Sequence, residues 1–329
     1  MAKDDISKQL NKLKNDGVQI WSNSRLNTFN TCQYEYYMNY ILKLESKDNI
    51  YNIMGNVIHD CLDDIHNNKK NELDMLTEYL IGLNKCKLFG IEFPADYIEK
   101  SWKTDMNHFI HNFKKLDGKH ITEHGFIFEL DGHVLTGYID ETREKDGIVE
   151  ILDWKTSSEF KDGKLQEAGR QLLIYALAYE NEKGKLPDKV GWYMLKYLYI
   201  DYDGKTKMVA RRNAVKDIKG LINTQLKKLG YSESDRDLLI TEAMNNNNLN
   251  NMPKEVQDRF QYRNCILYYD ITEERIQELK DYIKNTVNAV NNKDENNEEE
   301  WKPKENTKED FYCMNLCGHK EHCKYYKFG

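Results

Sequence analysis

The chain has 329 residues, of which 40% are hydrophobic and 12% aromatic, and this is enough to bury a sizeable core. Mean hydropathy is −0.82, and no apolar run reaches the roughly 18 residues of a membrane span, so a transmembrane helix is not expected. The formal net charge of −7 argues superficially against a nucleic-acid partner. The acid is unevenly placed, however: the stretch 294–300 is acidic and Asn-rich, and we expect it to be a solvated linker.

The first third of the chain is expected to be helical. A serine cap near residue 22 begins a helix that should run to about residue 42. Two further helical segments are expected at 53–67 and 73–116, and the second should be broken near Gly90 and Pro94.

Two Asp-Gly pairs predict a three-stranded meander over about residues 121–155. Asp131-Gly132 and Asp146-Gly147 each lie between runs rich in apolar and β-branched residues, where such a pair is a strong signal for a two-residue hairpin. With these pairs at the turn tips, Asp140 falls opposite Glu123 in the first hairpin and opposite Asp153 in the second. Three carboxylates would then form one row across the meander.

This row of carboxylates predicts a cation site. Directly opposed side chains have Cβ atoms about 4.5–5.5 Å apart, and like charges at that distance repel. Mg²⁺ or Mn²⁺ is the natural candidate to relieve the repulsion, because hard cations take oxygen ligands. Lys155 shares a face with Asp153 and could orient or deprotonate a water, or stabilise charge on a phosphodiester under attack. The alternative is a solvated strand face with unrelated acids and an ordinary lysine ion pair.

The elements after the meander complete an α/β pattern. A helix is expected over 165–180, strands over 190–200 and 207–212, and helices over 214–229, 233–247 and 272–291, with a polar loop at 245–251. Strands followed by a helix and further strands predict a central mixed β-sheet flanked by helices, with an additional helical lobe. No internal repeat is present.

Five pieces of the sequence, in the right order, carry a family resemblance. Three form the core: Gly137-Tyr138-Ile139-Asp140, Asp153-Trp154-Lys155-Thr156 and Gln171-Leu172-Leu173-Ile174-Tyr175. The other two are Gly55-Asn56-Val57-Ile58-His59 and Ser24-Arg25-Leu26-Asn27-Thr28-Phe29 with Cys32. Together they resemble the PD-(D/E)XK nucleases, which have a restriction-endonuclease-like core, and specifically the RecB-like exonuclease branch. The resemblance covers about residues 20–200 and reappears in the last cysteines, while Trp154 replaces a residue that is usually smaller.

The resemblance implies a set of metal ligands. Mg²⁺ or Mn²⁺ would be held by His59, Asp140, Asp153 and the backbone carbonyl of Trp154, with the indole of Trp154 on the opposite face. Without the resemblance, His59 reads as an ordinary residue of an apolar helical stripe. Gly55, one turn earlier, could allow the helix to approach the sheet closely.

The resemblance also implies roles for polar side chains around the cation. Lys155 would serve the attacking water, and Glu123 joins the site on geometry more than on resemblance. Gln171 and Tyr175 are i, i+4 neighbours on a helix. They would face the cleft, where Gln171 orients the lysine, water or phosphate and Tyr175 contacts DNA, unless they are simply polar residues at the edge of an amphipathic helix.

The cysteines give a second signal. Three of the seven cluster as Cys313-x₃-Cys317-x₅-Cys323 near the end of the chain. The N-terminal segment is charged and lacks the apolar part of a secretion signal, so we expect a cytoplasmic, reducing environment in which clustered thiols are metal ligands. Thiolates suit an iron–sulfur cluster or zinc, and His319 and His322 could complete a zinc site.

The resemblance favours the iron–sulfur interpretation. It implies a 4Fe–4S cluster on one N-terminal and three C-terminal cysteines, here Cys32, Cys313, Cys317 and Cys323, although the first C-terminal gap is three residues instead of the usual two. Zn²⁺ stays the alternative. Such a centre would tie the chain ends together over the core and stabilise the DNA-facing lobe. The other cysteines are expected to be small buried hydrophobes: Cys61, Cys86 and Cys265.

We therefore expect one elaborated nuclease domain over 1–329. Its parts are a helical part with Cys32 and His59 (20–118), a catalytic α/β core (119–212), a second helical part (213–292), an acidic linker (293–304) and the cysteine cluster (305–329). The implied function is metal-dependent hydrolysis of phosphodiester bonds in DNA, as an exonuclease on single-stranded or unwound ends, in recombination, repair or phage DNA processing. A structure-specific endonuclease and a non-catalytic iron–sulfur DNA-binding subunit are the alternatives.

Two further groups of residues could contact DNA. Aromatic side chains in the first helix are too dense for one buried stripe; some could stack on bases, although core packing is the expected role for most. They are Phe29, Tyr34, Tyr36, Tyr37 and Tyr40. Basic residues between positions 205 and 228 could contact the phosphates of DNA. They could equally form the solvated face of a helix. They are Lys205, Lys207, Arg211, Arg212, Lys216, Lys219, Lys227 and Lys228.

Overall fold

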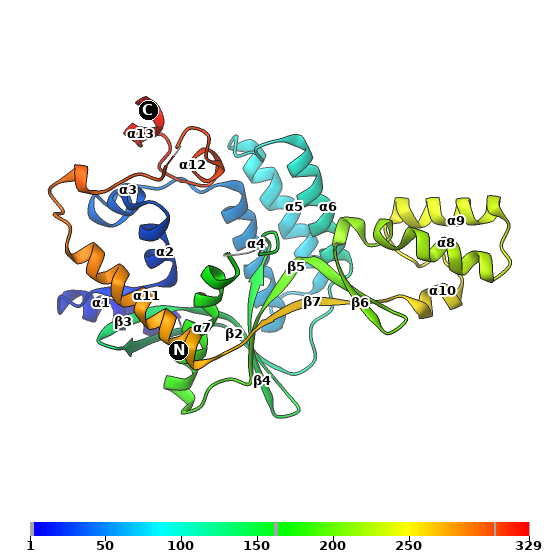
Figure 1. The fold of residues 1–329 in the computed structure, drawn as a ribbon, viewed down its shortest axis with the longest axis horizontal. Coiled ribbons are helices and arrows are strands. Elements are labelled where there is room, and N and C mark those ends of the chain that lie inside the picture. Colours follow the sequence, from blue (N-terminus) through cyan, green and yellow to red (C-terminus); the bar gives the residue numbers. More distant parts are fainter. Residues whose placement is uncertain (1–2, 161–163, 306, 329) are drawn as a thin grey trace.

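The computed structural model describes residues 3–160, 164–305 and 307–328, and its centre is a mixed sheet of seven strands between helices (Figure 1). This confirms the α/β class expected from the sequence. The strands are β1 (Ile20–Trp21), β2 (Lys119–Leu130), β3 (His133–Lys145), β4 (Ile148–Lys155), β5 (Lys189–Tyr202), β6 (Lys205–Ala210) and β7 (Gln261–Tyr269).

The predicted meander is formed by β2, β3 and β4 in the predicted register. Leu130 pairs with His133 across the first turn, and Lys145 pairs with Ile148 across the second. All four residues of the two Asp-Gly turns have positive φ, between 48° and 81°, as a type I′ hairpin turn requires. β4 then pairs in parallel with β5, and the connection between them contains α7 (Lys164–Lys183).

Helices cover both faces of the sheet, and β5 shows how they divide its side chains. Trp192 and Met194 point into a core shared with α2, α7 and α11, whereas Tyr193 and Leu195 point into a core shared with α4, α5 and α6. This alternation with a period of two is the ordinary pattern of a strand buried on both faces. The bounds are α2 (Asn23–Thr31), α11 (Glu273–Asn291), α4 (Ile50–His66), α5 (Glu72–Leu88) and α6 (Asp96–His111).

A separate lobe lies at the far ends of β5, β6 and β7 (Figure 1). It has its own apolar cluster, into which Ile222, Ile240 and Val256 point. Two short 3₁₀ turns lead into it from β6, so the helix expected over 214–229 begins later than predicted. The elements are η2 (Arg211–Asn213), η3 (Lys216–Ile218), α8 (Lys219–Lys228), α9 (Glu233–Asn246) and α10 (Lys254–Arg259).

The single helix expected over about 22–42 is wrong, because the chain breaks at Cys32. This residue is extended (φ −155°, ψ 107°) and lies between α2 and α3 (Gln33–Tyr36), which is followed by a π-helical turn, η1 (Tyr37–Ile41). The aromatic residues around the break are mostly buried and pack on Trp301. They therefore serve the core, as expected for most of them.

The acidic stretch before the last cysteines is also more ordered than a solvated linker. It forms a 3₁₀ turn, η4 (Glu298–Glu300), and Glu298 accepts a hydrogen bond from the Tyr34 hydroxyl at 2.6 Å. Two short helices follow, α12 (Phe311–Asn315) and α13 (Lys324–Phe328). The helix α1 (Lys3–Asn15) was not predicted. Among the described residues, no helix is long and apolar enough to cross a membrane.

Candidate active site

The site lies at the point where β3 and β4 separate. The two strands pair as far as Glu141 and Leu152, and the next residue on each strand is Asp140 and Asp153. Beyond the fork the backbone N–H of Trp154 donates a 2.8 Å hydrogen bond to Oδ2 of Asp140 instead of to a strand partner. The fork thus buries two carboxylates beside each other, where their charges interact.

Glu123 joins them through a local distortion of β2. Its neighbours Thr122 and His124 pair with Glu141 and Ile139, but Glu123 has a positive φ of 49°. A non-glycine residue in this region costs about 1–3 kcal/mol, and such outliers gather at functional sites. The register predicted from the turn is correct on both sides of Glu123, while the distortion itself was not predicted.

His59 brings an imidazole from α4 to the same place. Its Nε2 lies 2.9 Å from the carbonyl oxygen of Trp154, and its Nδ1 lies 3.8 Å from Oδ2 of Asp140. An N–H at Nε2 donates to the carbonyl, which leaves the lone pair of Nδ1 facing a carboxylate. This is the arrangement of a metal-ligating histidine whose second nitrogen is fixed by a backbone acceptor.

Gly55 proves less constrained than we expected. A Cβ atom added there would lie 3.6 Å from Oγ1 of Thr156, which is ordinary van der Waals contact. The approach of α4 to the sheet therefore does not require glycine at this position.

Three donor groups form a set that fits a cation. One ligand atom each of His59, Glu123 and Asp140 lies within 4.8 Å of the others. The sequence had placed Asp153 and the Trp154 carbonyl in this ligand set. In the structure the Asp153 carboxylate lies 2.6 Å from the ammonium of Lys155, and the Trp154 carbonyl already accepts the His59 N–H.

Lys155 is held by a chain of polar contacts that reaches α7. Its ammonium donates to Oε1 of Gln171 at 3.1 Å, and the amide of Gln171 donates to the Tyr175 hydroxyl at 2.7 Å. Tyr175 is buried and Lys155 and Gln171 are only partly exposed, so these contacts hold the three side chains in place. Every residue singled out from the sequence for this site is thus brought together.

The electrostatics of the site favour a divalent cation. Burial and the neighbouring Asp153 raise the pKa of Asp140 well above its usual range, and burial lowers the pKa of His59. Burial alone would lower the pKa of Lys155, but Asp153 and Asp140 outweigh it and raise that pKa. Three carboxylates gather here beside the ammonium of Lys155, and a divalent cation bound among them would lower their mutual repulsion.

Behind Trp154 lies a polar cluster that was not predicted from the sequence. The indole N–H of Trp154 donates to Oε2 of Glu141 at 2.8 Å, and His66 stacks on the indole with ring centroids 5.7 Å apart. His120 lies 2.7 Å from the other carboxylate oxygen of Glu141. The alternation of side chains along a strand could have predicted this cluster. Glu141 follows Asp140 and Trp154 follows Asp153, so both side chains must face the side of the sheet opposite to the two acids.

The four cysteines expected to form a second centre converge at the chain ends. Burial, Asp310 and the neighbouring Cys32 and Cys323 raise the pKa of the Cys313 thiol to about 12. Burial, Glu35 and Cys32 raise the pKa of Cys317. The backbone N–H of Tyr34 donates to the carbonyl of Lys302 at 3.1 Å, so the chain next to Cys32 lies against the segment that leads to the last cysteines. The other three cysteines are buried among apolar side chains, as predicted.

The segment that carries the last cysteines is docked firmly on the N-terminal part. A Cβ atom added to Gly318 would lie 2.0 Å from Oγ of Ser46, so only glycine fits against that loop. The Tyr312 hydroxyl donates to Glu35 at 2.7 Å. His319, considered for a zinc site, is buried and lies 2.7 Å from the Asn39 side chain, while His322 is exposed.

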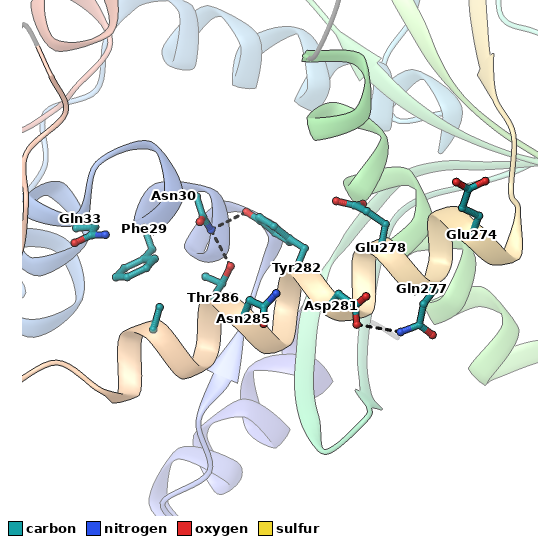
Figure 2. Close-up of a pocket in the computed structure, with 11 residues that line it drawn as sticks. Phe29, Asn30, Gln33, Glu274, Gln277, Glu278, Asp281, Tyr282, Asn285 and Thr286 are labelled. Carbon is teal, nitrogen blue, oxygen red and sulfur yellow. Dashed lines mark hydrogen bonds between the residues drawn. The ribbon is translucent and has the colours of Figure 1, made fainter.

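A cavity of about 810 Å³ lies away from these centres, between α2 and α11 (Figure 2). Glu274, Glu278 and Asp281 line it, and no lysine or arginine is among the described residues of its wall. Asn30 donates to Tyr282 and Thr286 across it. This acidic hollow would repel a phosphate backbone.

The fold and the fork define the chain as a hydrolase-type α/β protein with a candidate divalent-metal site. A family model, the PD-(D/E)XK nuclease superfamily, matches residues 20–324. The chain belongs to the PD-(D/E)XK nuclease superfamily. Divalent metal ions and a DNA substrate accord with this family and with the acidic and imidazole donors at the fork. No curated protein matches the chain in a sequence comparison.

Proposed function

We propose that the protein is a Mg²⁺- or Mn²⁺-dependent deoxyribonuclease of the RecB-like type, acting as an exonuclease on single-stranded or unwound DNA ends. One observation carries the proposal: His59, Glu123 and Asp140 converge within 4.8 Å beside a lysine that is paired with Asp153. A protein that only bound DNA would gain nothing from opposed, buried carboxylates, because they repel both each other and the phosphates.

Each residue has a role that follows from its contacts. His59, Glu123 and Asp140 would hold the divalent ion, which supplies Lewis-acid activation of the phosphodiester and charge stabilisation when bound. Asp153 fixes the ammonium of Lys155 beside the site. That ammonium, steadied by Gln171, orients the attacking water and stabilises the negative charge that develops on the phosphoryl oxygens.

The cysteine centre is proposed as a 4Fe–4S cluster on Cys32, Cys313, Cys317 and Cys323. Its support is that the chain next to Cys32 lies against the segment that carries the other three thiols, and that Cys313 and Cys323 are buried there. Two groups of described residues could hold a single metal ion: His59 with Glu123 and Asp140, and His66 with His120 and Glu141. Neither group contains one of these cysteines. The centre has a structural role, because it joins the N-terminal helices to the segment after the acidic stretch.

Degradation of labelled single-stranded DNA tests the enzyme claim. With Mg²⁺ or Mn²⁺, the wild-type protein should shorten the strand, and Lys155→Met should lose at least about a hundredfold in rate because the ammonium is absent. Lys189→Met is a matched control, since Lys189 is a half-exposed lysine of the neighbouring strand β5. Equal rates for wild type and Lys155→Met, or no cleavage by either, would remove the claim.

The choice between exonuclease and endonuclease needs a substrate without ends. An exonuclease should degrade a linear single strand and leave the closed circle of the same sequence intact. Cleavage of both at similar rates would show an endonuclease, with the chemistry of the site unchanged.

A further inference from the structure

A second cavity, of about 700 Å³, lies beside the catalytic lysine. Its wall is built from α4, α6, the end of β4, β5 and the segment that carries the last cysteines. Its wall includes three aromatic side chains, those of Tyr51, Tyr97 and Phe311. It also includes two cationic side chains, Lys196 and Arg212, and the hydroxyl of Thr156.

Its position follows from the strands. Thr156 is the residue directly after Lys155. Lys196 lies two residues beyond Met194, which is the β5 partner of Lys155, and two strand residues span about 6.6 Å. Oγ1 of Thr156 lies 3.6 Å from the position of a Cβ added to Gly55, and Gly55 is about one turn before His59 on α4, so the cavity and the candidate metal site are neighbours along this helix.

Two basic side chains of the cavity wall lie near a single described carboxylate. Lys196 and Arg212 share one buried carboxylate, Asp105, which accepts the backbone N–H of Arg212 at 2.6 Å and also pairs with its guanidinium. No aspartate or glutamate is among the described residues of the wall. Lys196 is only 8% exposed, and this burial lowers its pKa while Asp105 opposes the shift, so an anion entering the cavity would stabilise the charged form of the ammonium.

The aromatic residues give the cavity a second kind of binding surface. Tyr97 is 73% exposed and Phe311 is 49% exposed, so neither ring is needed to fill the core. Exposed rings beside cations are the combination that single-stranded nucleic acids bind, with bases stacked on rings and phosphates on the cations. A hollow of this size holds a ligand of drug or nucleotide size, and a base pair with both its backbones is too large for it.

We propose that this cavity binds one unpaired nucleotide of the DNA strand, next to the phosphodiester that is cleaved. Its phosphate lies against Lys196 and Arg212, and its base lies against Tyr97 and Phe311. The proposal rests on the nuclease function proposed above and names the form of its substrate. It gives the preference for unpaired DNA a physical cause, because a nucleotide must leave its duplex to enter.

Binding of a labelled single-stranded oligonucleotide tests this site. Fluorescence anisotropy is measured on the full chain with Mg²⁺ in the Lys155→Met background, so that the strand is not degraded. Tyr97→Ala should weaken binding about tenfold, the size of one lost stacking contact. Lys196→Met should also weaken it, and should reduce the slope of log affinity against log salt by about 0.7, because one phosphate contact is lost.

Two control variants separate a local effect from a general one. Phe89→Ala removes an exposed ring directly after α5, and Lys189→Met removes the lysine that begins β5. Neither residue lines the cavity. Both should bind like the parent. Lys196 is buried, and its replacement could disturb folding. Tyr97 is 73% exposed, so Tyr97→Ala should fold normally and tests the site even if Lys196→Met does not fold.

The outcomes distinguish this site from the nuclease function. If the wild type degrades single strands but Tyr97→Ala binds as tightly as Phe89→Ala, with the salt slope of Lys196→Met unchanged, the cavity is not the nucleotide site and the nuclease proposal stands. If the wild type neither degrades nor binds single strands, both proposals are overturned together.

Discussion

Trp154 connects the two polar sites on either side of the sheet. Its backbone N–H and carbonyl contact Asp140 and His59 on the side of the candidate metal site, while its indole N–H contacts Glu141 on the other side. A buried carboxylate that loses a donor pays a desolvation cost. The indole therefore stabilises Glu141 and also fixes the strand that carries Asp153 and Lys155.

Replacing Trp154 by phenylalanine should cost more stability than the same change at Trp192. Both indoles are buried, but the N–H of Trp192 has no hydrogen-bond partner among the described residues. The two variants lose similar packing, and only Trp154→Phe leaves a buried carboxylate short of a donor. The difference in the free energy of unfolding, measured in urea, should be about 1.5–3 kcal/mol. Equal losses would show that the Glu141 contact contributes nothing.

At this scale much of the candidate site could be predicted from the sequence, because turn geometry fixes register. Two Asp-Gly turns were enough to bring Glu123, Asp140 and Asp153 to one place, although neither predicted opposed pair, Glu123 with Asp140 or Asp140 with Asp153, belongs to the observed strand ladders. The positive φ of Glu123 could not be predicted, since it depends on the surrounding tertiary structure and not on local preference. The pairing of Asp153 with Lys155 is likewise a choice among several nearby partners that spacing alone does not settle.

Among the elements, α7 packs against β7 through a glycine. A Cβ atom added to Gly169 would lie 2.3 Å from the ring of Tyr269, so either the helix or the ring must move. Gly220 in α8 has no atom within 4 Å of such a Cβ. The two positions therefore offer the same substitution with opposite physical consequences.

Gly169→Ala should destabilise the protein by about 1–3 kcal/mol through overpacking, whereas Gly220→Ala should stabilise it by up to about 1 kcal/mol through helix propensity. Thermal unfolding of both variants beside the wild type measures this. A stable Gly169→Ala protein would show that α7 does not press on Tyr269.

The helix α6 contributes a pH-dependent part of the stability through His108. Burial, and then the nearby Arg211, lower the pKa of His108 to about 4, against about 6.5 in an unfolded chain. Between these values the unfolded state binds the proton and the folded state does not. This contribution is therefore complete above about pH 6.5 and is lost as the pH falls towards 4.

Removing the imidazole should flatten the acid side of the stability profile. We expect His108→Gln to lose less stability than the wild type between pH 7.5 and 5, measured by urea unfolding at each pH. His111→Gln, an exposed histidine on the same helix, is the control and should follow the wild type. If the free energy of unfolding of His108→Gln falls with pH as steeply as that of the wild type, the pH dependence comes from other groups.

Two features that were not predicted, β7 and the break at Cys32, have a common cause. β7 pairs with β5 across about 60 intervening residues, so no turn marks it in the sequence. The break at Cys32 is accompanied by contacts made far along the chain, such as Tyr34 N–H to the carbonyl of Lys302 at 3.1 Å. Local patterns identify hairpins and amphipathic helices, and they miss elements whose partners are distant.

At the scale of the whole molecule, the cysteine segment lies against the residues that begin the helix α4, which carries His59. Leu316, in the cysteine segment, accepts a hydrogen bond at 3.0 Å from Asn49, the residue that caps the helix carrying His59. The same segment contributes Phe311 to the cavity beside Lys155. A centre on the cysteines would therefore stabilise the DNA-facing wall before it affects the cation at Asp140.

Cys317→Ser should lose visible absorption and iron, lower the melting temperature and weaken DNA binding, while cation binding at Asp140 persists. Anaerobic purification, an absorption spectrum and metal analysis check this, with Cys86→Ala as the control that keeps the centre. Zinc in place of iron would correct the identity of the centre. A Cys317→Ser protein that is folded, colourless and fully active would refute its role.

The most direct test of the whole account is a calorimetric titration of Mn²⁺ into the wild type and Asp140→Asn, in which one buried carboxylate becomes a neutral isostere. The account predicts a site in the wild type that weakens more than about tenfold in Asp140→Asn and is unchanged in Asp117→Asn, where the carboxylate is 84% exposed. If Asp140→Asn binds Mn²⁺ as tightly as the wild type, no cation sits at the fork between β3 and β4, and the proposed chemistry has no basis.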